Sequence, residues 1–287
     1  MKIFTYFLEY LFVKFFFIII KLFPLSISEN LSRFIFRTIG KLSNADKIAL
    51  NNCRFVFPNL EALKIRKIID ESWNNIGLNL CELLNFNKLI NKNKVCFSGL
   101  EHIDYLRKNN LQAIFISIHQ SNWELLVPML DRLNFKIGGI YRHINNFFLD
   151  RLILKIRKST LISNQNFYTP KGKQSAKELI EAINKNFSIV LLIDQKDSAG
   201  ENIKFFKKDV KTQIGFLKIA RKFNLPIVPI KNTRLRNGQI ELNFQKPIFH
   251  DNLQISDSVM MRNIHELIEN WIISNPSQWF WQHKRFN

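Results

Sequence analysis

The chain has 287 residues, of which 46% are hydrophobic, so it is long and apolar enough for one large or two small domains with a substantial core. Its net charge of +19 favours a polyanionic partner, such as nucleic acid, an anionic membrane surface or an acidic protein, although A/T-rich codons are an alternative source of the many Lys residues. The three cysteines, Cys53, Cys81 and Cys96, lack metal-ligand spacing, which argues against a thiolate metal site and indicates reduced thiols in a cytosolic environment.

Residues 1–25, MKIFTYFLEYLFVKFFFIIIKLFPL, form an apolar segment interrupted by Glu9, Lys14 and Lys21. These charges leave no uninterrupted run of the about 20 apolar residues that a spanning helix needs, and no small-x-small cleavage site follows. On a helix the charged residues share one arc, and Phe, Ile and Leu cover the rest. The pattern predicts a helix in the membrane interface whose lysines reach the headgroups, with a core helix of a soluble domain as the alternative.

The remainder of the chain predicts an α/β domain. Residues 27–92 carry apolar side chains at helical spacing, and we expect helices there. Strands are predicted over residues 111–119, 135–142, 187–194, 225–236 and 239–249. Helices are predicted over residues 121–133, 145–159, 173–186, 212–224 and 260–275. This alternation predicts one domain over residues 26–287, with a mostly parallel or mixed central sheet flanked by helices, after the membrane-associating helix of residues 1–25.

Three polar residues stand at the carboxyl ends of predicted strands: His119, Arg142 and Asp194. Ligands of α/β sheets bind beyond these ends, so the three residues mark a candidate site.

The stretch ISIHQSNWELL, residues 116–126, has two interpretations that are compatible with each other. Ser121 and Glu124 match the capping box S-x-x-E. Alternatively, His119 lies on a strand-to-helix turn, where Glu124 bonds one imidazole nitrogen and leaves the other to take a proton from a hydroxyl. The helix N-terminus would favour a phosphate or a developing oxyanion nearby. No third ligand stands at a suitable spacing, so we expect no metal.

Four blocks, in the same order and at similar spacing, resemble the bacterial lipid A biosynthesis acyltransferases, the late lauroyl/myristoyl transferases of the glycerolipid acyltransferase superfamily. The blocks are GLEHIDYLRKNNLQAIFISIHQSNWELL (99–126), YRHINNFFLDRLILKIR (141–157), DQKDSAGENIKFF (194–206) and QWFWQHKRF (278–286). The chain departs from the family pattern at His143, which replaces Pro, at Lys196, which replaces a second Asp, and at Lys204 and Lys207, which replace Pro and Gly. These departures bear on the substrate more than on the reaction, because His119 and Glu124 are intact.

The resemblance implies a glycerolipid acyltransferase-like fold and acyl transfer, without a cofactor, from an acyl carrier protein thioester to a hydroxyl of an anionic lipid A precursor. His119 would be the general base, and Glu124 would orient it. The remaining candidates have supporting roles. The resemblance assigns Arg142 and Asn122 to the oxyanion or an acceptor phosphate, Asp194 and Gln195 to the sugar or the catalytic loop, and Trp123, Tyr141, Asp150 and Arg157 to support of the site or the fold.

The same resemblance implies a location at the cytoplasmic face of the bacterial inner membrane, where a basic surface would favour both an acidic carrier protein and anionic lipid. The acyl chain needs an apolar groove, which the 27 Phe residues would line unless they belong to the core.

Three alternatives stay open from the sequence. The same chemistry also fits another acceptor: a phosphoinositol mannoside, a glycerophospholipid or an aminolipid. A non-catalytic basic protein that binds membranes would account for the charge, whereas nucleic acid is not an expected partner because no nucleic-acid motif is recognised. A degenerate acyltransferase is the third alternative, given Lys196, Lys204 and Lys207.

Overall fold

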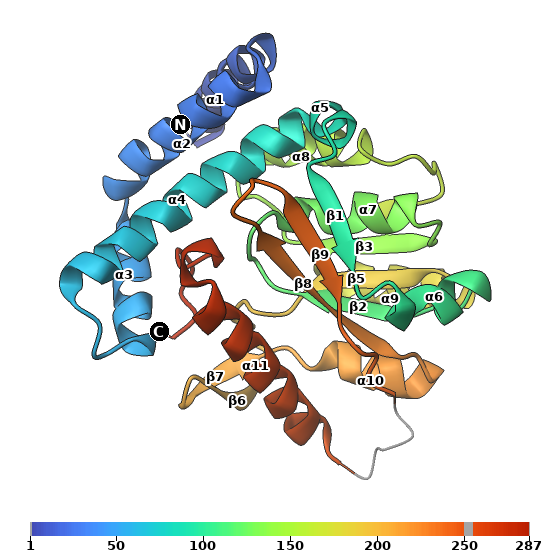
Figure 1. Ribbon diagram of the computed structural model, residues 1–287. Coiled ribbons are helices and arrows are strands. Elements are labelled where there is room, and N and C mark those ends of the chain that lie inside the picture. Colours follow the sequence, from blue (N-terminus) through green and yellow to red (C-terminus); the bar gives the residue numbers. More distant parts are fainter. Residues whose placement is uncertain (1, 250–254, 287) are drawn as a thin grey trace.

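The computed structural model describes residues 2–249 and 255–286 (Figure 1). Helices occupy most of the first third of the chain, as the apolar spacing predicts. They are α1 (Lys2–Leu22), α2 (Leu25–Lys41), α3 (Asn44–Val56), α4 (Ala62–Leu84) and α5 (Phe86–Asn91).

A seven-stranded sheet follows, with the strand order β1-β9-β8-β2-β5-β3-β4. All neighbouring strands are parallel except β8 and β9, which are antiparallel. The predicted mixed sheet flanked by helices is therefore confirmed. The strands are β1 (Val95–Ser98), β2 (Ile114–Ser117), β3 (Ile137–Tyr141), β4 (Phe167–Pro170), β5 (Ser188–Leu192), β8 (Ile227–Arg234) and β9 (Ile240–Phe244). The helices among them are α6 (Glu101–Lys108), α7 (Leu126–Arg132), α8 (Phe147–Lys158), α9 (Lys173–Asn184), α10 (Gly215–Phe223) and α11 (Asp257–Ser274).

Both faces of the sheet are covered, because successive residues of a strand point to opposite sides. In β2, Ile114 and Ile116 join the apolar cluster formed with α9, α10 and α11, whereas Phe115 joins the cluster on the other face with α6 and α7. The central strands are consequently buried along almost their whole length, which explains the continuous apolar runs by which they are predicted.

The edge strands β1 and β4, helix α6 and the hairpin of β6 (Glu201–Phe205) and β7 (Lys208–Thr212) are absent from the predicted elements. β1 is only half-buried, and in the hairpin buried residues alternate with exposed, mostly polar ones. Such segments lack the apolar run by which the central strands are recognised.

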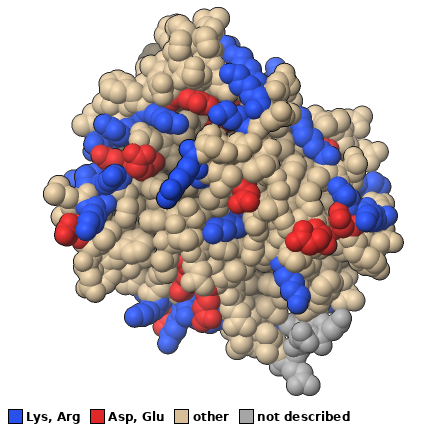
Figure 2. All heavy atoms as spheres, viewed as in Figure 1, with Lys and Arg blue, Asp and Glu red and all other residues tan. Residues whose placement is uncertain are grey.

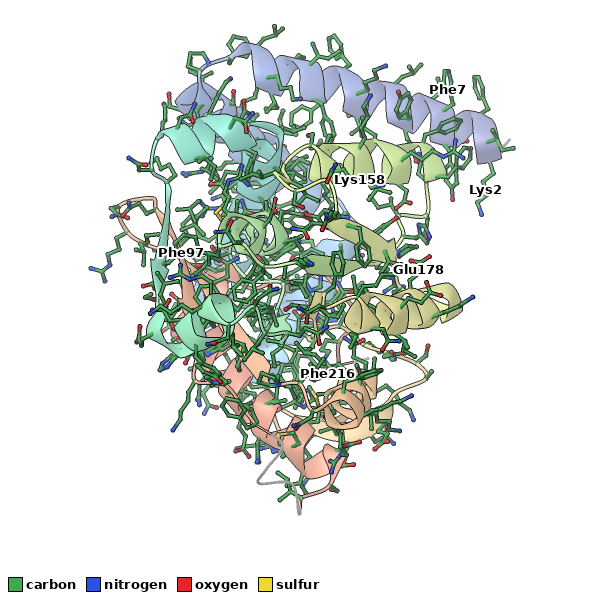
Figure 3. The ribbon with its side chains drawn as sticks, turned by 90° about the vertical axis from the view of Figure 1, so that its right-hand side faces the viewer. Lys2, Phe7, Phe97, Lys158, Glu178 and Phe216 are labelled. Atoms are coloured by element: carbon green, nitrogen blue, oxygen red, sulfur yellow. The ribbon has the colours of Figure 1, made fainter. Side chains whose placement is uncertain are left out.

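Helix α1 lies across α8 at one end of the molecule, with α2 beside it (Figure 3). Phe17 and Ile20 are its buried side chains, and most of its other apolar residues are exposed. Asn146, at the start of α8, donates hydrogen bonds to the Tyr6 carbonyl at 2.8 Å and the Glu9 carboxylate at 2.9 Å. Within the described chain, α1 is long and apolar enough to cross a membrane by length and composition, although its charges predicted a poor spanning segment.

Candidate active site

A cavity of about 800 Å³ opens at the carboxyl ends of β2, β3 and β5. His119, Arg142 and Gln195 line it, each a short distance beyond the end of its strand. Asp194 is fully buried behind His119. Of the three strand-end residues predicted from the sequence, His119 and Asp194 are therefore in contact, and Arg142 lines the same cavity as His119, in keeping with the parallel order of these strands.

The imidazole of His119 is held by Asp194. Nδ1 lies 2.7 Å from Oδ1 of Asp194, and the His119 backbone N–H donates to Oδ2 at 3.1 Å. Burial is the largest single influence and raises the pKa of Asp194, but His119, His283 and the Trp279 hydrogen bond together bring the pKa well below its usual range. An ionised carboxylate only accepts hydrogen bonds, so the Nδ1 of a neutral His119 carries the proton and the lone pair on Nε2 can accept one. The side-chain amide of Gln195 lies 3.4 Å from Nε2.

The C-terminal segment completes the carboxylate's partners. Trp279 is fully buried, and its indole N–H donates to Oδ2 of Asp194 at 2.8 Å. The backbone N–H of Phe280 donates to the His119 carbonyl at 2.8 Å, and the rings of Phe280 and Trp123 lie 6.0 Å and 5.2 Å from the imidazole. The aromatic run near the C-terminus thus fixes both the carboxylate and the histidine.

Glu124 does not take the place at Nδ1 that the sequence suggested. Its two oxygens accept from Nε and Nη2 of Arg157 at 2.7 and 2.6 Å. Burial is the largest single influence and raises the pKa of Glu124, but Arg157, with smaller effects of His119 and Trp123, brings the pKa below its ordinary value. The bidentate geometry satisfies both oxygens, which explains why Asp194 is the orienting carboxylate. Glu124, Arg157 and His119 all line the same cavity.

The capping box does not form either. Ser121 has a positive φ of 50°, and Asn122 instead accepts the Glu124 backbone N–H at 3.1 Å. The Asn122 amide donates to the buried Glu82 at 2.7 Å, and Glu82 is held by Arg234 through two bonds of 2.6 and 2.9 Å. Since Asn122 is fully buried and its amide is already bonded, the structure does not support it as an oxyanion donor.

The other candidates lie around the cavity wall. The exposed Arg142 lines the cavity at the end of β3. The Tyr141 ring lies under the Arg157 guanidinium at 5.5 Å, so it contacts the Glu124 partner. Asp150 accepts from Nδ1 of His143 at 2.7 Å. Trp123 packs against His119 and lines the cavity.

A second cavity, of about 520 Å³, adjoins the first and shares with it Ile140, Lys171, Leu191, Asp197 and Gln213. Its additional lining is mainly apolar and comes from the sheet, α9 and α10. That lining includes Ile114, Leu179, Ile189, Phe216 and Ile219. Both volumes lie in the range of small-molecule sites.

Two of the departures from the family pattern, Lys204 and Lys207, lie in the β6–β7 hairpin, whereas Lys196 lines the first cavity. Phe206 and Lys207 have φ values of 47° and 65°, the left-handed pair of a two-residue hairpin loop. Glycine adopts this conformation without strain, which accounts for Gly at that position in similar sequences.

The sequence did not predict four residues that build or line the candidate site: Glu82, Arg234, Trp279, and His143 as a partner of Asp150. Glu82 carries the available signal, since it is a charge within an apolar stretch, whereas Arg234 follows the polar residues Lys231, Asn232 and Thr233. Trp279 lies in an aromatic block that the sequence did single out, but its indole N–H partner is 85 residues away.

The bacterial lipid A biosynthesis acyltransferase family matches residues 1–287, the whole chain. Among curated proteins, the chain is similar to the lipid A biosynthesis myristoyltransferase of Escherichia coli (strain K12), with 24% identity over 267 residues, covering 89% of this chain and 78% of that protein. Among solved structures, it is similar to the 1-acyl-sn-glycerophosphate acyltransferase PlsC from Thermotoga maritima, with 15% identity and a TM-score of 0.40, covering 85% of this chain and 95% of that one.

The Glu124–Arg157 pair gives a stability prediction. Replacing Arg157 with Gln leaves a buried carboxylate without its partner, and we expect R157Q to lower the free energy of unfolding by about 3–5 kcal/mol. Because the folded-state pKa of Glu124 is lowered, the pair stabilises the fold above the ordinary value of 4.5, and this contribution is lost as the pH falls. Denaturant unfolding at neutral pH and near pH 4 measures both effects.

The matched control is K64Q, which removes an exposed pair between Lys64 and Glu61 at 3.5 Å. We expect a change of less than about 1 kcal/mol there. Equal effects of R157Q and K64Q would contradict the assignment of Glu124 and Arg157 as a stabilising buried pair.

Proposed function

Since the chain belongs to the bacterial lipid A biosynthesis acyltransferase family, as its four sequence blocks predicted, we propose that it moves a fatty acyl chain from an acyl carrier protein thioester to a hydroxyl of a lipid A precursor. Family membership makes it an acyltransferase. The observation that carries the finer proposal is the His119–Asp194 pair, which stands in a cavity joined to an apolar compartment.

The free Nε2 of His119 takes the proton of the acceptor hydroxyl. The alkoxide oxygen then attacks the thioester carbonyl carbon, and the carbonyl π electrons move to the oxygen. When the tetrahedral intermediate collapses, the C–S bond breaks and the His119 imidazolium returns its proton to the leaving thiolate. Buried Asp194 stabilises this cation through Nδ1, as an orienting carboxylate does in acyl-transfer triads.

Glu124 acts differently in this proposal from the orienting role that its spacing suggested. Paired with Arg157, it lines the cavity close to His119 and holds the turn after β2 to α8, which fixes the wall beside the base. The Gln195 amide and the Arg142 guanidinium are the donors we assign to the developing oxyanion or to an acceptor phosphate, because both line the cavity. Tyr141 supports this wall through Arg157.

We assign the acyl chain to the second cavity. It adjoins the first, and its lining from β2, β5, α9 and α10 is mainly apolar. Phe216 and Phe280 line the second and first cavities, respectively, whereas Phe115, Phe205 and Phe244 belong to the buried core. Phenylalanines that line the groove are thus few, and Ile and Leu supply most of its apolar surface.

The partners follow from charge. Arg142 and Lys171 line the cavity, and the chain has a net charge of +19, which suits an acidic acyl carrier protein and an anionic glycolipid. We place the enzyme at the cytoplasmic face of the bacterial inner membrane, with residues 1–25 as the membrane-associating helix and residues 26–287 as the acyltransferase domain. In Figure 2 the end of the molecule over α1 is mostly uncharged, with basic side chains beside it.

Acyl transfer is tested by mass spectrometry of the lipid formed from C12- or C14-loaded acyl carrier protein and a tetra-acylated lipid A precursor. We expect one added acyl chain with the wild type and a rate about 10²–10⁴-fold lower with H119A, because the general base is lost. D194N, which cannot hold the same tautomer through an ionised carboxylate, should also lose most of the activity. Product from wild type and H119A at equal rates would contradict the assignment of the base. No product from the wild type would move the proposal to another lipid acceptor or to an inactive homologue.

The acyl compartment predicts a change in chain-length preference. Gly215 lines the second cavity, and a Cβ at this position meets no atom within 4 Å. The Phe side chain in G215F should fill that space and exclude the end of a long acyl chain. Each methylene that loses its apolar contact should cost about 0.8 kcal/mol of binding, which lowers kcat/KM about fourfold. The preferred donor should therefore become shorter, as competition between C10, C12 and C14 donors would show. G215A is the control. An unchanged chain-length preference in G215F would contradict the assignment of the acyl chain to the second cavity.

Membrane association is tested on the outward face of α1. Phe12 and Phe15 are 67% and 63% exposed, so F12E/F15E places two charges on this surface with little effect on packing. We expect the double variant to shift from the membrane to the soluble fraction. L63E, at an 83% exposed position of α4, is the control and should stay with the membrane. Retention of F12E/F15E in the membrane fraction would show that α1 is not the anchor.

A further inference from the structure

A second histidine–carboxylate pair lies at the same cavity. His143 lines the cavity beside Arg142, and its Nδ1 is 2.7 Å from Oδ2 of Asp150. The other oxygen of Asp150 accepts the backbone N–H of Ile144 at 2.9 Å. Asp150 is thus fixed at the start of α8, and it fixes His143 in turn.

The tautomer of His143 follows by the same reasoning as for His119. The Asp150 carboxylate accepts from Nδ1, so a neutral His143 imidazole has its lone pair on Nε2. Within the described residues, Nε2 of His143 makes no hydrogen bond. The pair therefore presents one fixed acceptor atom, which suits a hydroxyl donor.

Exposure separates the roles of the two histidines. The side chain of His119 is 17% exposed and its carboxylate is fully buried, whereas the side chain of His143 is 60% exposed. A base that must stabilise developing charge works best away from water, and an exposed acceptor suits recognition. Asp194 also has Trp279 as a third donor, whereas Asp150, which is itself buried, binds His143 and the backbone N–H of Ile144.

The position of the loop that carries His143 indicates which part of a substrate reaches it. Residues 142–146 join β3 to α8, and Asn146 at their end bonds the Tyr6 carbonyl and the Glu9 carboxylate of α1. The acceptor arrives from the membrane in the proposed function, and the loop lies between α1 and the cavity that His119 lines, so the acceptor headgroup would pass this loop.

We propose that His143, held by Asp150, binds a substrate hydroxyl at the mouth of the cavity, and that this hydroxyl belongs to the headgroup of the acceptor lipid. The proposal rests on the proposed acyl transfer. A hydroxyl on the pantetheine arm of the donor is the other source of the same chemistry. His143 stands where similar sequences have Pro, so this contact would distinguish the chain's acceptor recognition from theirs.

The test measures KM separately for the acceptor at saturating donor and for the donor at saturating acceptor. In H143N the amide nitrogen replaces Nδ1 opposite Asp150, and the acceptor atom at Nε2 is lost. We expect KM for the acceptor to rise about three- to tenfold, the effect of one hydrogen bond, with kcat within twofold of the wild type. In H143Q the side-chain carbonyl reaches toward the position of Nε2, and KM should return toward the wild-type value.

D150N tests the same contact without replacing His143. Its amide can donate to Nδ1, which moves the imidazole proton to Nε2 and turns the acceptor into a donor. We expect D150N to raise KM like H143N, although His143 is retained. N145A, on the same exposed loop, is the control with unchanged KM.

A rise confined to KM for the acceptor assigns the hydroxyl to the headgroup, and a rise confined to KM for the donor assigns it to the pantetheine arm. Unchanged KM values in H143N and D150N would overturn the proposal, as would a lowered melting temperature with no change in KM. Failure of the wild type to form product would instead count against the proposed function.

Discussion

The carboxylate of Asp194 is the group on which the site depends. It is fully buried and accepts from Nδ1 and the backbone N–H of His119 and from the indole of Trp279. An unpaired buried carboxylate would cost several kcal/mol, so these three donors stabilise its charged form and hold together the ends of β2 and β5 and the C-terminal segment. The position of His119 and the packing of the C-terminal segment therefore depend on the same carboxylate.

Two further ion pairs hold the turn after β2 in place. Arg157 of α8 holds Glu124, and Arg234 of β8 holds Glu82, which binds Asn122. Each pair ties the turn after β2 to a distant element, so Asn122 and Glu124, which both follow His119, are fixed independently of each other. Because α8 also carries α1, the proposed membrane helix and the wall of the cavity share one support. A lipid hydroxyl would therefore meet the base close to the surface from which it arrives.

Much of this arrangement follows from sequence, since the apolar runs of β2, β3 and β5 are long and buried and their ends place His119, Arg142 and Asp194 together. The sequence did not predict which carboxylate binds Nδ1 of His119. Spacing favoured Glu124, five residues away, but Arg157, 33 residues from Glu124, binds both of its oxygens. Asp194 and Trp279 are 75 and more residues from His119, and side-chain contacts at that separation depend on sheet order, which sequence patterns predict only in outline. The half-buried edge strands and the polar hairpin were not predicted from the sequence, because they carry no apolar run.

The central claim is that Asp194, and not Glu124, sets the tautomer of His119. Long-range ¹H–¹⁵N spectra of ¹⁵N-histidine-labelled enzyme, with the His119 signals identified by their loss in H119A, measure this directly. The account predicts a protonated Nδ1 and an unprotonated Nε2 in the wild type. It also predicts that this pattern persists in E124Q and is lost in D194N. A protonated Nε2 in the neutral wild type, or a pattern that changes in E124Q and persists in D194N, would contradict it.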